Sequence, residues 1–235
     1  MDFDWREYLR RISFDGAVSV DSTSLVRLHQ RQIRTMAFEN FDILLGRPIE
    51  LHPARLWQKL VENQRGGYCF ELNGLLLMAL RAFGFEARAL LAHIHVSGTP
   101  EALRTHQLSL VTLEGEDWLV DVGFGSTSPR APVRLTLDLP QQQETDCLRV
   151  VTYPNEAYLL QSLIDGEWQD QYSFHLDVVE DADIQRGNQY TSTDPKSFFT
   201  HTGVAALQHE QGRTALSNYS LRDIVDGQET LSTLA

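Results

Sequence analysis

The chain has 235 residues, of which 42% are hydrophobic and 22% charged, and these values are ordinary for a folded protein. This length accommodates one large domain or two to three small ones that share cores. With 20 Lys+Arg against 32 Asp+Glu the net charge is -12, which argues against non-specific binding to nucleic acid or to anionic membranes.

The sequence has no pattern typical of export or of membrane insertion. It opens with Met1-Asp2-Phe3-Asp4-Trp5-Arg6-Glu7, which is not an apolar signal region. The most apolar stretch, Leu75 to Leu80, is far shorter than the roughly 20 residues of a membrane-spanning helix. Two cysteines, Cys69 and Cys147, do not make a disulfide framework. We therefore expect a cytoplasmic protein.

The first third of the sequence predicts helices. Apolar residues recur at three- and four-residue spacing between Asp4 and Ile12, and Asp21 or Ser22 can cap a second helix. Pro53 fits the first turn of a third helix. A longer apolar pattern at helical spacing, residues 72–83, predicts a fourth.

Cys69 lies at the start of this fourth helix. Gly66-Gly67 lets the backbone turn sharply just before it. A sulfur at a helix start lies near unpaired N–H groups and the positive end of the helix dipole, which favours the nucleophilic thiolate. The alternative is an inert, buried cysteine, which is the commoner environment of a lone intracellular thiol.

A thiolate nucleophile needs a base, and a predicted hairpin supplies one. Glu114-Gly115 is typical of a two-residue turn with positive φ, so Leu113 should face Glu116 across the two strands. In that register His106 faces Gly123, and Asp121 faces Leu108. Because side chains alternate along a strand, His106 and Asp121 project from the same face as diagonal neighbours. We expect a His–Asp pair on one sheet face, beneath the cysteine helix.

The rest of the sequence predicts strands followed by a short mixed tail. Runs rich in β-branched and aromatic residues, broken by Gly, Pro, Asn and Asp, indicate an antiparallel sheet or small barrel. These runs are Ala87–Val96, Gln107–Leu113, Trp118–Val122, Leu148–Thr152, Tyr158–Ser162 and Tyr172–Leu176. In the tail, Phe198, Phe199, Val204 and Leu207 indicate a helix, and Thr214–Val225 indicates a hairpin around Asn218.

Two further patterns in the sequence resemble ligand-binding sites. His93 and His95 alternate on one strand, yet no third ligand follows at a recognisable spacing, so we expect no metal site. The segment Gly123-Phe124-Gly125-Ser126-Thr127 lacks the lysine and spacing of a phosphate loop. It is either a bend that ends the Asp121 strand or a place where backbone N–H groups approach a ligand.

At this point the sequence resembles a known family. Two segments resemble motifs of the arylamine N-acetyltransferases. The nucleophile motif is matched by Arg65-Gly66-Gly67-Tyr68-Cys69-Phe70-Glu71, and the aspartate motif by Leu119-Val120-Asp121-Val122-Gly123-Phe124-Gly125. Two more segments resemble motifs of that family: Ala37-Phe38-Glu39-Asn40-Phe41-Asp42 and Tyr190-Thr191-Ser192-Thr193-Asp194-Pro195. The motifs occur in the family order over residues from about 5 to 225.

The resemblance implies an α+β fold with a papain- or transglutaminase-like Cys-His-Asp core. Residues 1–84 would form a helical bundle that carries Cys69. Residues 85–189 would form an antiparallel β-barrel that carries His106 and Asp121, and residues 190–235 an α/β lid. Family members, of which the bacterial type is nearest, commonly continue for a few dozen residues, so a chain that stops at Ala235 is expected to have a shortened lid.

The resemblance also implies a set of ligand-binding residues. Phe38, Phe70 and Phe124 would form an apolar pocket for the acceptor. Gly123, Gly125 and Ser126 would lie beside the acyl-CoA. No permanently bound cofactor and no metal are expected, only acetyl-CoA as co-substrate. The oligomeric state is left open.

The implied activity is a two-step transfer of an acetyl group from acetyl-CoA through a Cys69 thioester to an arylamine, arylhydrazine or N-hydroxyarylamine. His106, oriented by Asp121, would activate the thiol. Two alternatives keep the same triad: an amide synthase that uses a longer or carrier-bound acyl donor, and a thiol hydrolase.

Overall fold

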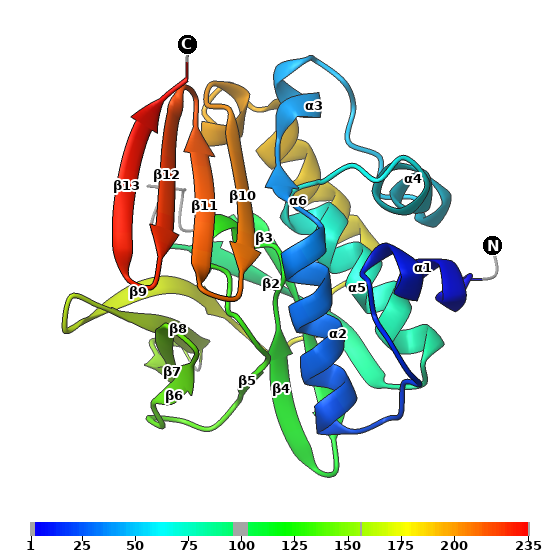
Figure 1. Ribbon diagram of the computed structural model, residues 1–235. Coiled ribbons are helices and arrows are strands. Elements are labelled where there is room, and N and C mark those ends of the chain that lie inside the picture. Colours follow the sequence, from blue (N-terminus) through cyan, green and yellow to red (C-terminus); the bar gives the residue numbers. More distant parts are fainter. Residues whose placement is uncertain (1–2, 96–102, 156, 235) are drawn as a thin grey trace.

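The computed structural model describes residues 3–95, 103–155 and 157–234, and its N-terminal part is helical (Figure 1). The helices are α1 (Trp5–Arg11), α2 (Ser22–Thr35), α3 (Phe41–Leu44), α4 (Pro53–Trp57) with a π-helical turn (Gln58–Glu62), and α5 (Cys69–Ala82). The expected caps are present, because the Asp21 carboxylate accepts the Ser24 N–H at 2.7 Å and Pro53 opens α4. The four predicted helices are therefore confirmed.

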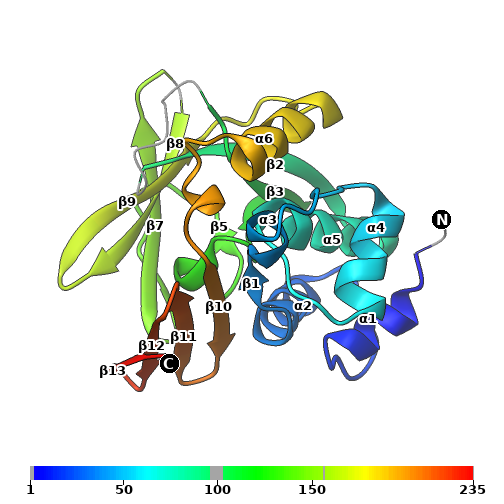
Figure 2. The same cartoon turned by 90° about the horizontal axis from the view of Figure 1, so that it is seen from above.

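Helix α5 is the centre of the helical region. Its buried leucines, Leu72, Leu75, Leu76 and Leu80, belong to one core with Leu25 and Leu28 of α2 and Tyr8 of α1. Strand β3 lies along the other side of α5. In the view from above, helices α1, α2 and α4 gather at one side of the molecule and strands β7 and β9 at the other (Figure 2). Helix α5 thus joins the helical region to the sheet.

The middle of the chain forms an eight-stranded antiparallel sheet, ordered β5-β4-β3-β2-β9-β8-β7-β6. The strands are β2 (Glu86–Ile94), β3 (His106–Leu113), β4 (Glu116–Val120), β5 (Val133–Arg134), β6 (Gln141–Gln143), β7 (Asp146–Tyr153), β8 (Ala157–Ile164) and β9 (Glu167–Phe174). The Gln141 side chain bonds both the N–H and the carbonyl of Arg134, so the two edge strands β5 and β6 are linked and the barrel is nearly closed. Val96, the last residue expected in the first of these strands, lies outside the described residues.

The β3–β4 hairpin has the predicted register. Leu113 faces Glu116 and Ser109 faces Val120, and the turn residues Glu114 and Gly115 have φ of 55° and 81°. Two consecutive positive φ angles define the turn that matches the twist of the flanking strands. The local sequence therefore sets which residues of the two strands lie opposite one another.

The C-terminal part is a second sheet, and here one prediction is wrong. Strands β10 (Val204–His209), β11 (Gly212–Ser217), β12 (Ser220–Val225) and β13 (Gln228–Thr233) follow one another, and β10 also pairs with β1 (Phe38–Glu39). The expected hairpin around Asn218 is the β11–β12 turn. The expected helix is only a 3-10 turn (Phe198–Thr200), since Val204 and Leu207 lie in β10, where two strands bond its backbone.

Helix α6 (Asp181–Thr193) joins the two sheets and was not predicted. The boundary expected between residues 189 and 190 falls inside this helix, whereas the one at residue 84 falls between α5 and β2. Within the described residues, no helix is long and apolar enough to cross a membrane.

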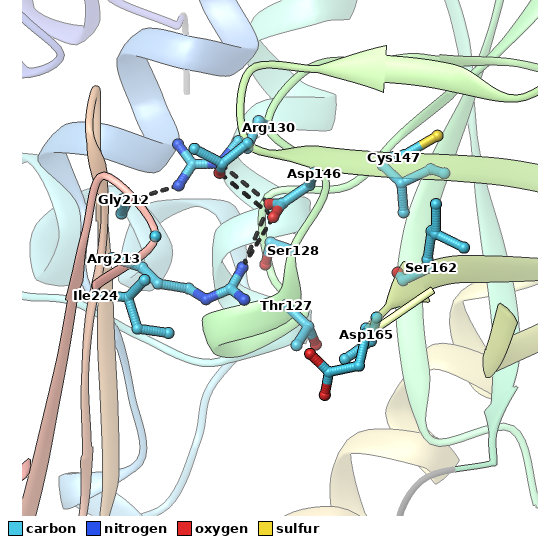
Figure 3. Close-up of a pocket in the computed structure, with 15 residues that line it drawn as sticks. Thr127, Ser128, Arg130, Asp146, Cys147, Ser162, Asp165, Gly212, Arg213 and Ile224 are labelled. Atoms are coloured by element: carbon cyan, nitrogen blue, oxygen red, sulfur yellow. Dashed lines mark hydrogen bonds and ion pairs between the residues drawn. The ribbon is translucent and has the colours of Figure 1, made fainter. Parts of the chain in front are cut away.

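A buried arginine ties the second sheet to the barrel. Arg130, which is 2% exposed, donates to the carboxylates of Asp146 and Glu144 and to the carbonyls of His209 and Gly212. Arg213 of β11 also pairs with Asp146, at 3.3 Å. Arg130, Asp146, Gly212 and Arg213 border a small cavity of about 290 Å³ between the two sheets (Figure 3). Arg130 is therefore the main polar link between the barrel and the C-terminal sheet at this end.

Replacing Arg130 by Met should destabilise the protein by about 3 kcal/mol, because two carboxylates and two carbonyls each lose a hydrogen bond from a buried guanidinium. Urea denaturation measures this free energy of unfolding. Arg134→Met is the matched control, since Arg134 is exposed and its ion pair with Glu116 is long, at 3.5 Å. A loss below about 1 kcal/mol for Arg130→Met would contradict this assignment.

Candidate functional site

Cys69 is the first residue of α5 and is almost fully buried, at 3% exposure. Its thiol lies 3.8 Å from the Thr105 carbonyl, just before β3. The Glu71 carboxylate accepts the Tyr68 N–H at 3.1 Å, which fixes the chain where the helix begins. The sulfur thus has the expected position at a helix start, facing the end of the barrel.

Glycines around Cys69 permit close approach rather than a turn. Neither Gly66 nor Gly67 has a positive φ, contrary to the expected sharp turn. A Cβ at Gly66 would instead lie 2.2 Å from the Ala37 carbonyl oxygen, and one at Gly123 would lie 2.8 Å from the Cys69 Cα. Any larger residue at either position would push the segment carrying the thiol away from its neighbours.

His106 and Asp121 form the expected pair at the end of the hairpin. The His106 Nε2 lies 2.7 Å from the Asp121 carboxylate, and both side chains are 1% exposed. The other carboxylate oxygen accepts the Asn73 amide and the Gly123 N–H, each at 2.9 Å. Because Nε2 is engaged by Asp121, Nδ1 is the ring nitrogen left to face Cys69. The structure therefore brings the three predicted catalytic residues together.

The electrostatics of the pair favour its charged form. Burial alone lowers the pKa of His106, but the charge and hydrogen bond of Asp121, together with Cys69, raise that pKa to about 10. Burial alone raises the pKa of Asp121, whereas His106, Asn73 and the Gly123 N–H lower it below its ordinary value. At neutral pH the imidazole is thus protonated and the carboxylate ionised.

Aromatic rings surround the imidazole. Phe124 packs edge-on to His106 with ring centroids 5.0 Å apart, and Tyr172 of β9 lies 5.1 Å away. Burial, and then the charge of Asp121, raise the pKa of Tyr172 well above its usual value, so its hydroxyl stays neutral. From α2, His29 Nε2 donates to the Asp121 carbonyl at 3.0 Å. The ring of His106 is therefore packed between the barrel wall and the loop after β4, while the helical region holds the backbone of its partner Asp121.

A cavity of about 1050 Å³ opens beside these residues. Cys69 and His106 line its inner end, and the C-terminal sheet, helix α6 and the 3-10 turn after it supply the other walls. The remaining lining residues are Phe38, Ile94, Thr105, Gly123, Phe124, Gly125, Ser126, Thr127, Tyr190, Thr191, Lys196, Ser197, Phe198, Phe199, Val204, Ala205, Ala206, Ala215, Leu216, Ser217, Ser220, Arg222 and Leu231.

Five of the six residues expected to bind ligands line this cavity: Phe38, Phe124, Gly123, Gly125 and Ser126. Phe70 does not. Its ring packs on Tyr68, with centroids 5.5 Å apart, and against Gly187 of α6, where a Cβ would lie 2.8 Å from it. Because successive helix positions point about 100° apart, Cys69 faces the cavity while Phe70 faces the interior.

Sequence reasoning missed Asn73 and Tyr172, which contact the His106–Asp121 pair. Asn73 was detectable, because it lies four residues after Cys69 and so shares its helix face. It donates to Asp121 and accepts the Val122 N–H at 2.9 Å. Tyr172 gave no such signal, since it reaches His106 only through the pairing of β9 with β2.

The described residues contain no cluster of three or more His, Cys, Asp or Glu side chains able to hold a metal ion. His93 Nδ1 donates to the Leu103 carbonyl at 3.1 Å, and His95 Nε2 lies 2.9 Å from the Ser173 hydroxyl. Both histidines have protein partners in the barrel.

Several known proteins resemble this chain in sequence and in fold. A family model described as N-acetyltransferase matches residues 21–234. The arylamine N-acetyltransferase of Escherichia coli is 37% identical over 94% of this chain and 79% of its own length. The solved structure of the Salmonella typhimurium arylamine N-acetyltransferase superposes with a TM-score of 0.94 at 32% identity, covering 100% of this chain and 87% of that one. The solved structure of the Mycobacterium marinum arylamine N-acetyltransferase in complex with CoA superposes with a TM-score of 0.92 at 33% identity, covering 99% of this chain and 87% of that one.

The stability of the protein should depend on pH through His106. Its pKa is about 10 in the folded state against an ordinary value of 6.5, so its contribution is complete below about pH 6.5 and is lost as pH rises through 10. The difference in unfolding free energy between the unaltered protein and His106→Gln, measured with urea, should therefore shrink between pH 7 and pH 10. In a Cys69→Ala background the fall should be complete at a lower pH, because Cys69 is one of the groups that raise the folded-state pKa of His106. A constant difference across this range would contradict the raised pKa.

Proposed function

The chain belongs to the arylamine N-acetyltransferase family, and on that premise we propose that Cys69, His106 and Asp121 transfer an acetyl group from acetyl-CoA to an arylamine. Members with this name move acetyl groups to arylamines, so the chain is an enzyme of that class. The observation that carries the proposal is the position of Cys69 at the start of α5, beside an imidazole whose other nitrogen lies 2.7 Å from a buried carboxylate. The M. marinum structure solved with CoA supports the choice of donor.

In the first step the Cys69 sulfur attacks the thioester carbonyl carbon. The protonated His106 interacts electrostatically with Cys69, and this interaction is one of the causes that raise the pKa of His106. A new C–S bond forms, the bond to the CoA sulfur breaks, and His106 gives its proton to the departing thiolate. The backbone N–H of Cys69, which has no partner within the helix at this position, is placed to donate to the oxyanion.

In the second step the acceptor amine attacks the acetyl-cysteine. The neutral His106 removes a proton from the nitrogen, the C–S bond breaks, and the Cys69 thiolate and the imidazolium are restored. Asp121, held by the Asn73 amide and the Gly123 N–H, keeps the ring oriented through both steps. Phe38 and Phe124 give the cavity apolar walls that suit flat, weakly basic aryl amines, hydrazines or N-hydroxyarylamines better than water.

Gly123, Gly125 and Ser126 are proposed to lie against the donor near its thioester. Gly125 has a φ of 66°, and together the three residues form the bend between the Asp121 strand and the cavity. Backbone N–H groups can approach a ligand closely there because the two glycines lack side chains. Phe70 is not assigned a substrate contact, since its ring packs on Tyr68 and Gly187.

Acetyl-CoA alone should acylate Cys69 in a burst that releases one CoA thiol per active site. Intact-mass measurement should show one added acetyl group, and an arylamine or hydrazine should then restart CoA release with ping-pong kinetics. Cys69→Ala should show neither the burst nor the added mass. Labelling by a long aromatic acyl thioester but by no short acyl-CoA would instead identify an amide synthase, and steady CoA release without an acceptor would identify a hydrolase.

Asp121→Asn should reduce acetyl transfer by about 10²- to 10⁴-fold, because an amide holds the imidazole in the wrong tautomer and removes the charge that keeps it protonated. The single-turnover rate of Cys69 acylation measures this loss. Asp117→Asn on the same hairpin, whose carboxylate bonds the Thr112 hydroxyl at 2.7 Å, should stay near the unaltered rate. Comparable rates for the two variants would remove Asp121 from the mechanism.

A further inference from the structure

The charge of the cavity lining differs from that of the whole chain. Acidic residues outnumber Lys and Arg by 32 to 20, yet no Asp or Glu is among the described residues that line the large cavity. Two cations, Lys196 and Arg222, are among its lining residues. A cavity with cations and without carboxylates attracts an anionic ligand into an otherwise negative protein.

The two cations differ in their partners. Arg222 Nε lies 3.1 Å from the Glu229 carboxylate on the neighbouring strand, and both side chains are about half exposed. Within the part of the chain that the structure describes, no carboxylate lies within ion-pair distance of the Lys196 ammonium. The nearby Asp194 carboxylate instead accepts the Lys196 backbone N–H at 2.8 Å. The Lys196 ammonium is therefore not neutralised by a carboxylate of the described residues and is available to an anionic ligand.

A straight row of residues crosses the C-terminal sheet and ends at Arg222. Phe38 pairs with Ala206, Ala206 with Ala215, and Ala215 with Arg222, and all four line the cavity. From β1 to β12 the row crosses three strand spacings, or roughly 14 Å. The two alanines in its middle leave space above the sheet, where strands β10, β11 and β12 run side by side (Figure 1).

We propose that Lys196 and Arg222 bind phosphate groups of the thioester donor, while its pantetheine arm lies over the row Phe38–Ala206–Ala215–Arg222. This inference rests on the proposed function, since it takes the thioester carbonyl to lie at Cys69. The arm is a thin, extended chain, which suits a floor of small side chains. Its phosphate end then reaches the outer cations. A phosphate is a stronger partner for an exposed ammonium than water is, because the contact is charge-assisted.

Three donors that differ only in phosphate content test the proposal: acetyl-CoA, S-acetyl-phosphopantetheine and S-acetyl-pantetheine. The ratio of the Cys69 acylation rate constant to the donor dissociation constant is measured for each by single turnover. Lys196→Ala should lower this ratio about 3- to 10-fold for acetyl-CoA, which is the loss of one partly exposed charge-assisted contact. For S-acetyl-pantetheine it should change by less than about twofold. S-acetyl-phosphopantetheine carries a single phosphate, as a donor on a carrier protein does. It shows whether one phosphate is enough for the rate to depend on Lys196.

Control variants separate this contact from other effects. Lys196→Arg should retain the preference for acetyl-CoA, and Arg222→Ala should reduce it less than Lys196→Ala, since Glu229 already neutralises part of the Arg222 charge. Arg10→Gln removes the same net charge from an exposed site on α1 and should leave all three donors unaffected. The Lys196→Ala effect should also diminish at high salt. Equal losses with phosphorylated and unphosphorylated donors, or no loss at all, would overturn the proposal.

Calorimetry in the Cys69→Ala background gives a readout that needs no acyl transfer. CoA should bind more tightly than pantetheine, and adding Lys196→Ala should weaken CoA alone. If Cys69 is never acylated but CoA binding still depends on Lys196, the proposed reaction fails and this inference stands. CoA that binds no better than pantetheine would overturn it.

Discussion

The start of helix α5 is held against the end of the β3–β4 hairpin by a contact so close that only glycine fits at residue 123. A Cβ there would lie 2.8 Å from the Cys69 Cα and 2.7 Å from the Asn73 amide nitrogen. Asn73 spans the same contact, because it donates to the Asp121 carboxylate and accepts the Val122 N–H. Cys69, the proposed nucleophile, comes from a helix and His106, the proposed base, from a sheet. Their relative position therefore depends on this junction.

The junction also explains how an ion pair persists in a dry site. Both His106 and Asp121 are 1% exposed, and burial by itself disfavours both charges. The Asn73 amide and the Gly123 N–H satisfy one carboxylate oxygen while the imidazole satisfies the other. A buried pair that is fully hydrogen-bonded can stay charged, whereas removing any donor would leave an uncompensated charge.

The second sheet is held in place by polar contacts with the rest of the protein rather than by a hydrophobic core of its own. The Asn40 side chain donates to the carbonyls of Phe199 and Thr202 and accepts the Val204 N–H, so the helical region holds one end of β10. At the other end Arg130 bonds the carbonyls of His209 and Gly212. The large cavity lies between this sheet and the barrel, so these polar contacts fix its width.

Patterns within short segments determined much of the fold and the three central residues. The apolar spacing and the residues Asp21 and Pro53 set where helices begin, because capping is a local effect. The turn at Glu114-Gly115 set the hairpin register and hence the His106–Asp121 pairing. Helix α6 escaped detection because its sequence is largely polar.

Only the tertiary structure decided how α6 is held, which way Phe70 points, and where Lys196 and Arg222 lie. Gly187 of α6 lets the helix approach the Phe70 ring. Likewise, Val204 and Leu207 have helical spacing in the sequence but form a strand, because β1 and β11 offer backbone partners on both sides. Contacts between segments far apart in the chain leave no local pattern, and these contacts shape the cavity beside Cys69 and His106, which local patterns in the sequence could identify.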